Sequence, residues 1–309
     1  MEELPTSVSI REVGPRDGLQ NEAPVPTAAK VRLLDALSRT GVRRIEAVSF
    51  VHPKAIPQMA DADEVWAAAE KAEGVRYSAL VPNSRGAQRA LAAGFRELEV
   101  VVSASDTHNR HNVNRSTDES LDDIGALIAA IRADSGAAAA RPTIEVIIST
   151  SFGCPYEGDV APARVLSLVD RVVADGADRV AFGDTTGMAT PRRVADLLDA
   201  VRGRHPDTPM LLHFHNTRGT ALANILTALR YGITEYDASV GGLGGCPYAP
   251  GATGNVATEE VVHMLHDMGI GTGIDLDAMI EAARLAEGIV GRELPSGVLR
   301  AGPRIRDHG

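Results

Sequence analysis

The sequence predicts an α/β protein with a single (β/α)8 TIM barrel and an additional C-terminal helical segment. The chain of 309 residues has a normal length for one such barrel. Short runs rich in β-branched residues alternate with longer helical patterns, which is typical of parallel strands joined by crossover helices. Eight of these short runs can be counted, and eight strands are the number that closes such a barrel.

We expect one catalytic domain over residues 1–309, with the barrel at about 8–270 and a helical extension and tail at about 271–309. The expected strands are Val8–Arg11, Arg43–Ser49, Arg76–Val81, Arg96–Val102, Thr143–Thr150, Arg179–Phe182, Met210–Phe214 and Glu235–Val240. The expected helices are Thr27–Arg39, Asp61–Ala72, Ser84–Ala93, Asp118–Ala133, Pro162–Ala174, Pro191–Arg204, Thr220–Tyr231, Thr258–Met268 and Leu276–Val290. A doubly wound open sheet is the competing architecture, but Gly14–Gly18 after the first strand lacks the dinucleotide-binding glycine spacing.

Charge and composition narrow the possible partners. The formal net charge is −10, which argues against nucleic-acid binding because that function needs a basic surface. An anionic small substrate remains compatible, since a local metal ion or arginine can override the mean charge. The two cysteines do not form a disulfide framework, and we see no secretory signal and no apolar run long enough for a membrane span. We therefore expect a cytoplasmic protein without membrane or nucleic-acid partners.

The active site of a barrel lies at the C-terminal ends of its strands, so polar residues at those ends are the candidates. They follow at least six of the expected strands. They are Glu12, Arg16, Asp17, Gln20, Glu46, Ser49, Ser103, Ser105, Asp106, Cys154, Asp184, Thr185, His213, His215 and Cys246. We therefore expect one rim to carry the chemistry.

His213 and His215 are the sharpest local signal. Residues i and i+2 of a strand point to the same face, so both imidazoles can aim at one point in the barrel mouth. Two imidazoles with carboxylate or amide oxygens suit Mg²⁺, Mn²⁺ or a similar divalent ion. The alternative is a pair of buried histidines that are satisfied by hydrogen bonds.

Arg16, Asp17 and Glu46 form the second group of candidates. Asp17 could be a carboxylate ligand from the first strand, although Asp-Gly is also ordinary turn chemistry. Arg16 could stabilise a developing enolate or grip a carboxylate, although most arginines simply lie on the surface. Glu46 should face the lumen, where it would hold a ligand or Arg16 in place.

A glycine-rich segment, Gly241–Gly245, ends in Cys246 and Pro247. Such a segment could cradle a phosphate or move as a lid, because glycine permits close backbone approach. Cys246 could then enter a closed site as a proton donor or acceptor. Most free cysteines are instead inert buried residues, and we interpret Cys154 in that way.

Several long motifs resemble those of the 3-hydroxy-3-methylglutaryl-CoA lyase family. The motifs are Arg11–Glu22, Ser239–Tyr248, Gly251–Glu259, Ser49–Val51 with Pro57–Met59, and Gly153–Gly158. The resemblance spans the chain from about Val8 to Glu287. It implies a barrel, a divalent cation (Mg²⁺ or Mn²⁺), and cleavage of 3-hydroxy-3-methylglutaryl-CoA into acetyl-CoA and acetoacetate.

The resemblance also implies roles for individual residues. The metal ligands would be Asp17, His213, His215 and Asn255. The catalytic group would include Arg16, Glu46 and Cys246 with Asp17 and His213, either of which could act as the base. We expect the substrate to contact Arg16, Gln20, Ser103, Arg218, Gly244 and Gly245. A homodimer or a higher homo-oligomer is expected on the same ground.

The sequence departs from the family pattern at two places near the acyl end of the substrate. Asn216-Thr217-Arg218 stands where the family commonly has Asp-Thr-Tyr, and the segment Asp106–Asn112 lacks the lysines that are common there. Three other hypotheses about the function of the chain therefore stay open. They are a lyase of the same mechanism for another 3-hydroxy-acyl-CoA, an acetyl-CoA-dependent condensing synthase, and a non-catalytic binding barrel.

Overall fold

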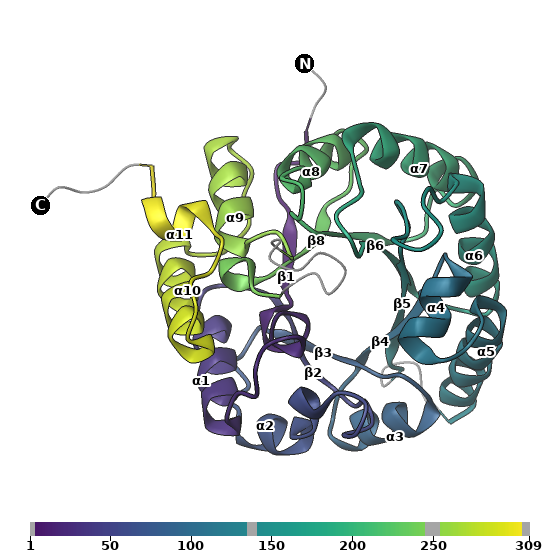
Figure 1. Cartoon of the computed structure of the whole chain (residues 1–309), viewed down its shortest axis with the longest axis horizontal. Coiled ribbons are helices and arrows are strands. Elements are labelled where there is room, and N and C mark those ends of the chain that lie inside the picture. The colour runs from purple at the N-terminus through teal and green to yellow at the C-terminus, as the bar shows by residue number, and fades with distance from the viewer. Residues whose placement is uncertain (1–3, 135–140, 245–253, 305–309) are drawn as a thin grey trace, which may run out of the picture.

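The computed structural model describes residues 4–134, 141–244 and 254–304, and it contains a closed barrel of eight parallel strands (Figure 1). The strands are β1 (Ser9–Glu12), β2 (Arg44–Ser49), β3 (Arg76–Leu80), β4 (Glu97–Ser103), β5 (Thr143–Ser149), β6 (Arg179–Asp184), β7 (Met210–Phe214) and β8 (Glu235–Ala238). They follow one another in sequence order, and β8 pairs with β1 to close the ring. The predicted (β/α)8 barrel is confirmed, and strand ends differ from the expected ones by at most two residues.

Helices surround the barrel in a ring (Figure 1). They are α1 (Thr27–Ser38), α2 (Ala62–Ala68), α3 (Ser84–Ala92), α4 (Asp106–Val113), α5 (Thr117–Asp134), α6 (Pro162–Ala174), α7 (Pro191–Arg204), α8 (Ala221–Arg230), α9 (Thr258–Asp267), α10 (Leu276–Val290) and α11 (Gly297–Ala301). The additional C-terminal helices α10 and α11 lie outside the ring, beside α1 and α9. Along the described part of the chain, no helix combines the length and the apolar character that crossing a membrane requires.

Helix α6 illustrates why these segments fold as they do. Its buried residues Val165, Leu168, Val169 and Val172 recur at the spacing that places them on one face toward the barrel. Pro162 occupies the first turn, where its missing N–H leaves no helical hydrogen bond unmade. The helix therefore begins at the proline and packs through a continuous apolar face.

Helix α4 was not expected from the sequence, because Asp106–Val113 is almost entirely polar and has no apolar face. The Ser105 hydroxyl caps it by accepting a hydrogen bond from the His108 N–H at 3.0 Å. The capping residue follows β4 directly, so the helix lies at the C-terminal rim of the barrel. This position brings His108, Asn112 and Val113 to the mouth of the barrel.

The barrel interior contains buried charges as well as apolar side chains. Arg11 on β1 is 1% exposed, and its guanidinium lies 2.5 Å from Glu99, 2.8 Å from Glu145 and 2.7 Å from Asp237. A buried charge is tolerated only when partners replace its hydration, and Arg11 has three carboxylate partners. The guanidinium therefore joins β1 to β4, β5 and β8 inside the barrel.

Candidate active site

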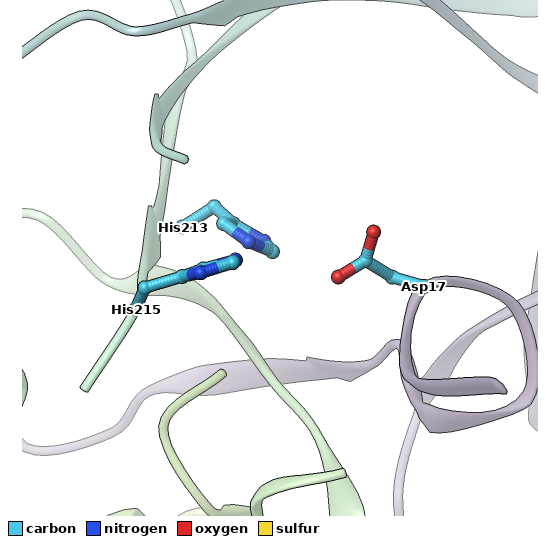
Figure 2. Close-up of side chains that lie close together, drawn as sticks. All are labelled: Asp17, His213 and His215. Atoms are coloured by element: carbon cyan, nitrogen blue, oxygen red, sulfur yellow. The ribbon is translucent and has the colours of Figure 1, made fainter. Parts of the chain in front are cut away.

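Asp17, His213 and His215 meet at the C-terminal rim of the barrel (Figure 2). Each offers one possible metal-ligating atom, and these atoms lie within 4.8 Å of one another. Both imidazoles project from the end of β7 toward the Asp17 carboxylate, which comes from the turn after β1. The alternation predicted for the strand thus places both rings on the same side.

Asp17 belongs to a short π-helical turn, Gly14–Gly18, that is anchored by Glu12. The Glu12 carboxylate accepts hydrogen bonds from Gly14 N at 2.7 Å, from Val240 N at 2.9 Å and from the Thr258 hydroxyl at 2.5 Å. A Cβ on Gly14 would lie only 2.7 Å from the Glu12 carboxylate. Glycine is therefore required there, and Glu12 ties this turn to the loop after β8 and to the start of α9.

Arg16 is held between two carboxylates. Its Nε donates to Glu46 Oε1 at 2.6 Å, and its Nη1 donates to Asp17 Oδ1 at 2.8 Å. Glu46 is fully buried, so the sequence-based expectation that it faces the lumen and holds Arg16 agrees with its position. Gln20 Oε1 is a weaker partner at 3.4 Å. The guanidinium is thus fixed before any substrate arrives.

The protonation states at this rim favour metal binding. Burial opposes ionisation of Asp17, but Arg16 and the two histidines outweigh it and lower the pKa of Asp17 to about 2. Burial and the neighbouring His213 lower the pKa of His215 to about 3. Burial also works against a charged His213, but its hydrogen bond to Asp237 raises the pKa of that ring. At neutral pH the rim therefore offers an ionised carboxylate and a neutral imidazole.

The donor set fits a divalent cation. Within the described part of the chain, His215 Nδ1 is buried and has no hydrogen-bond partner. An unpaired buried nitrogen is unfavourable unless a ligand uses its lone pair. Asn255 lies beside the group, with Nδ2 donating to Asp17 Oδ2 at 2.8 Å and to the Leu243 carbonyl oxygen at 3.2 Å. A rotated amide would present its oxygen there instead, which is the form that binds metal.

A cavity of about 300 Å³ opens beside these residues. Asp17, His213 and His215 form one side of its lining together with Arg16 and Asp237. Apolar side chains of three consecutive strands also line it, and they are Leu80, Val101 and Ile147. Such a cavity can take a small acyl group that has a polar, metal-binding end and an apolar end.

The remaining predicted site residues differ in position. Gln20 lines the cavity, whereas the Ser103 hydroxyl is buried and bonded to His108 Nδ1 at 2.8 Å. Arg218 is exposed and donates to the carbonyl oxygens of Thr186 and Gly187 at 2.7 and 2.9 Å, and it is not among the residues that line the cavity. The substrate roles of Ser103 and Arg218 stay predictions.

The glycine-rich segment is described only in part. Gly244 has a φ of +107°, and a Cβ on it would lie 2.8 Å from Asn255 Nδ2. Its backbone therefore lies close to Asn255, a candidate metal ligand, which agrees with the predicted place of Gly244 near the site. Gly245 and Cys246 lie outside the described residues.

Sequence reasoning did not assign Asp237 or Asn112 to the site, although both line the cavity. Asp237 also contacts His213, and Asn112 reaches the cavity from α4 together with His108. The alternation along β8 could have indicated Asp237, because it follows Glu235 by two residues in an expected strand. His108 lies in the segment that departs from the family pattern and could therefore read a different carboxylate or CoA group, whereas Asn112 had no signal of its own, because α4 has no apolar periodicity.

Comparison with known proteins agrees with this geometry. The HMGL-like family model matches residues 7–286. A hydroxymethylglutaryl-CoA lyase of Bacillus subtilis is 48% identical over 94% of this chain and 96% of its own length. An (R)-citramalyl-CoA lyase of Chloroflexus aurantiacus is 44% identical over 96% of this chain and 95% of its own.

A solved structure of an HMG-CoA lyase from Acinetobacter baumannii, in complex with coenzyme A and 3-methylmalate, has a TM-score of 0.91. It is 40% identical to this chain, and the match covers 100% of this chain and 99% of that one. The shared sequence therefore extends over the barrel, the rim and the additional helices. The chain belongs to the hydroxymethylglutaryl-CoA lyase family.

Proposed function

We propose that the chain is a divalent-metal-dependent carbon–carbon lyase that cleaves 3-hydroxy-3-methylglutaryl-CoA into acetyl-CoA and acetoacetate. The observation that carries this proposal is the convergence of Asp17, His213 and His215 beside Arg16, at a cavity of acyl size. The 48% identity to a hydroxymethylglutaryl-CoA lyase supports the choice of substrate.

The cation is Mg²⁺ or Mn²⁺, since oxygen and imidazole ligands suit these ions. Asp17, His213, His215 and Asn255 would hold it. When bound, the metal ion supplies Lewis acidity, which lowers the pKa of the tertiary hydroxyl of the substrate.

Arg16 stabilises the negative charge that develops when the carbon–carbon bond breaks. The departing two-carbon fragment is a thioester enolate, and its oxygen needs a preorganised positive group. The contacts to Glu46 and Asp17 fix the guanidinium, so little reorganisation is needed during the reaction. Burial of Glu46 raises the pKa of this carboxyl even though Arg16 opposes the shift.

Two proton transfers complete the reaction. Asp17 and His213 are the two candidate bases for the hydroxyl proton, and of these Asp17 has an oxygen to spare. A His213 ring that carries hydrogen on Nδ1 and holds the ion through Nε2 has no lone pair left to take a proton. Cys246, which the sequence puts at the end of the glycine-rich segment, returns a proton to the enolate carbon. The apolar residues Leu80, Val101 and Ile147 keep water away from the reacting carbons.

A second candidate is the same reaction on (R)-citramalyl-CoA. The relative that carries that activity in its name is 44% identical to this chain, which is close to the value for the hydroxymethylglutaryl-CoA lyase. Both substrates are 3-hydroxy-3-methyl thioesters that release acetyl-CoA, but they differ in their second product. Cleavage of 3-hydroxy-3-methylglutaryl-CoA gives acetoacetate, and cleavage of citramalyl-CoA gives pyruvate.

The experiment is a comparison of kcat/KM for the two thioesters on one preparation of the metal-loaded protein. Acetoacetate and pyruvate are measured separately by coupled dehydrogenases. We expect acetoacetate release to dominate, whereas dominant pyruvate release would establish the second candidate. Failure to release acetyl-CoA from either thioester would contradict both.

We also propose that the chain forms a homodimer or a higher homo-oligomer, as its family resemblance implies. Light scattering after size exclusion measures the mass directly against the 32.5 kDa of one chain. A mass of about one chain at micromolar concentration would contradict this proposal.

A further inference from the structure

Asp237 on β8 links the metal-site histidine His213 to the buried charge network of the barrel. It is 4% exposed, and its Oδ2 lies 3.1 Å from His213 Nδ1. On its other side, Arg11 Nε donates to Oδ1 at 2.7 Å and Arg11 Nη2 donates to Oδ2 at 3.0 Å. Asp237 is the register partner of Arg11 on β1 and of His213 on β7, so neighbouring strands place the three side chains in a row.

The contact between Asp237 and His213 decides which ring nitrogen is available. A carboxylate that is held by a guanidinium can only accept hydrogen bonds, so His213 Nδ1 must carry the hydrogen. The lone pair of the neutral ring is then on Nε2, the nitrogen on the other side of the ring from Asp237. A carboxylate in this position also restricts rotation of the ring.

Arg11 is itself fixed, because Glu99 and Glu145 hold the same guanidinium at 2.5 and 2.8 Å. Its ion pairs therefore anchor Asp237 to β4 and β5 on the far side of the barrel. His215 differs, since its Nδ1 has no hydrogen-bond partner within the described residues. The two histidines are thus unequal, and only His213 shows a carboxylate partner.

We propose that Asp237, held by Arg11, is a positioning residue that fixes the tautomer and ring plane of His213 so that Nε2 faces the metal ion. Asp237 acts through His213 and does not itself hold the ion. The inference rests on the proposed metal site and deepens it. It predicts that metal affinity depends on a carboxylate outside the ligand set.

Mn²⁺ binding to the metal-free protein tests the proposal. Free Mn²⁺ is titrated by electron paramagnetic resonance for wild type, Asp237→Asn and Glu145→Gln. The last variant is the matched control, because Glu145 is as buried as Asp237 and binds the same arginine without contacting His213. In Asp237→Asn, an NH₂ group replaces one of the two carboxylate oxygens. Whichever oxygen is replaced, the NH₂ group faces an N–H group of Arg11 or His213 that had donated a hydrogen bond to the carboxylate.

We expect Asp237→Asn to bind Mn²⁺ about 10- to 100-fold more weakly than wild type, and Glu145→Gln to stay within about threefold. Melting temperatures of the metal-free proteins report the stability lost in each variant. Unchanged affinity in Asp237→Asn would overturn the proposal, and so would an equal loss in both variants. Absence of Mn²⁺ binding to wild type would instead contradict the proposed function.

A tautomer measurement covers the case in which Asp237→Asn does not fold. Two-bond ¹H–¹⁵N spectra of the Mg²⁺-loaded wild type distinguish a protonated Nδ1 from a protonated Nε2, and His213→Gln identifies the signal. We expect His213 to carry its hydrogen on Nδ1. A hydrogen on Nε2 would refute the positioning role regardless of how the variants behave.

Discussion

Glu46 accepts a hydrogen bond from Arg16 Nε at 2.6 Å, although 30 positions separate the two residues in sequence. The contact joins the inward face of β2 to the turn that carries Asp17. Arg16 is only 8% exposed, so its charge is directed at the cavity and at its two carboxylates. The proposed mechanism relies on this fixed guanidinium.

Replacement of Arg16 by methionine should lower kcat by about 10²- to 10³-fold, because a preorganised charge for the enolate oxygen is lost. The variant should still bind Mn²⁺, since Asp17, His213 and His215 are all retained. Glu46→Gln is the companion variant, because its amide oxygen can still accept the hydrogen bond from Arg16 Nε. It should lose less activity than Arg16→Met, and normal turnover by Arg16→Met would contradict the role of the guanidinium.

Gly244→Ala should weaken metal binding by about tenfold, since the new methyl group would displace Asn255. Gly232→Ala is a suitable control. Gly232 also has a positive φ, at +71°, but nothing lies within 4 Å of the added Cβ. Both variants place an alanine at a positive φ, so both carry backbone strain. A difference between their Mn²⁺ affinities, measured by calorimetry, therefore reports the displacement of Asn255. Equal affinities in the two variants would argue against a role for Asn255.

The pH dependence of the free energy of unfolding should reveal the raised pKa of Glu12. Burial raises the pKa of Glu12 to about 7 against the opposing hydrogen bonds from Thr258, Val240 and Gly14. Between about pH 4.5 and 7 the folded chain therefore retains a proton that the unfolded chain releases. This contribution to stability is complete below pH 4.5 and is lost as the pH rises toward 7.

Glu12→Gln removes that proton exchange and keeps an amide oxygen for the backbone N–H groups. As the pH rises from 4.5 to 7.5, the wild type should therefore lose on the order of 3 kcal/mol of unfolding free energy relative to the variant. Urea unfolding at several pH values measures this difference. A difference that stays constant with pH would show that Glu12 is ionised in the folded protein.

The sequence predicts those parts of the site that depend on local geometry. His213 and His215 could be placed together because strand alternation is a local rule, and Glu46 could be placed in the lumen for the same reason. Asn255 gave no such signal and was found only through the family resemblance. It reaches Asp17 across 238 positions, so the contact depends on how the barrel closes.

The parts that the sequence did not predict depend on long-range packing. Arg11 and Asp237 are 226 positions apart and become neighbours only when β8 pairs with β1. Helix α4 forms at a capped, polar segment where no apolar periodicity exists, and it brings His108 and Asn112 to the cavity. Chain topology fixes these contacts, and a local pattern does not reveal them.

The most direct test of the account is metal removal and reconstitution, followed by an assay for acetoacetate release. Protein that has been stripped with a chelator should be inactive with 3-hydroxy-3-methylglutaryl-CoA, and Mg²⁺ or Mn²⁺ should restore turnover at about one ion per chain. His213→Ala, which removes one of the three clustered ligands, should not be restored by the same addition. Turnover that continues unchanged after complete metal removal would contradict the central claim.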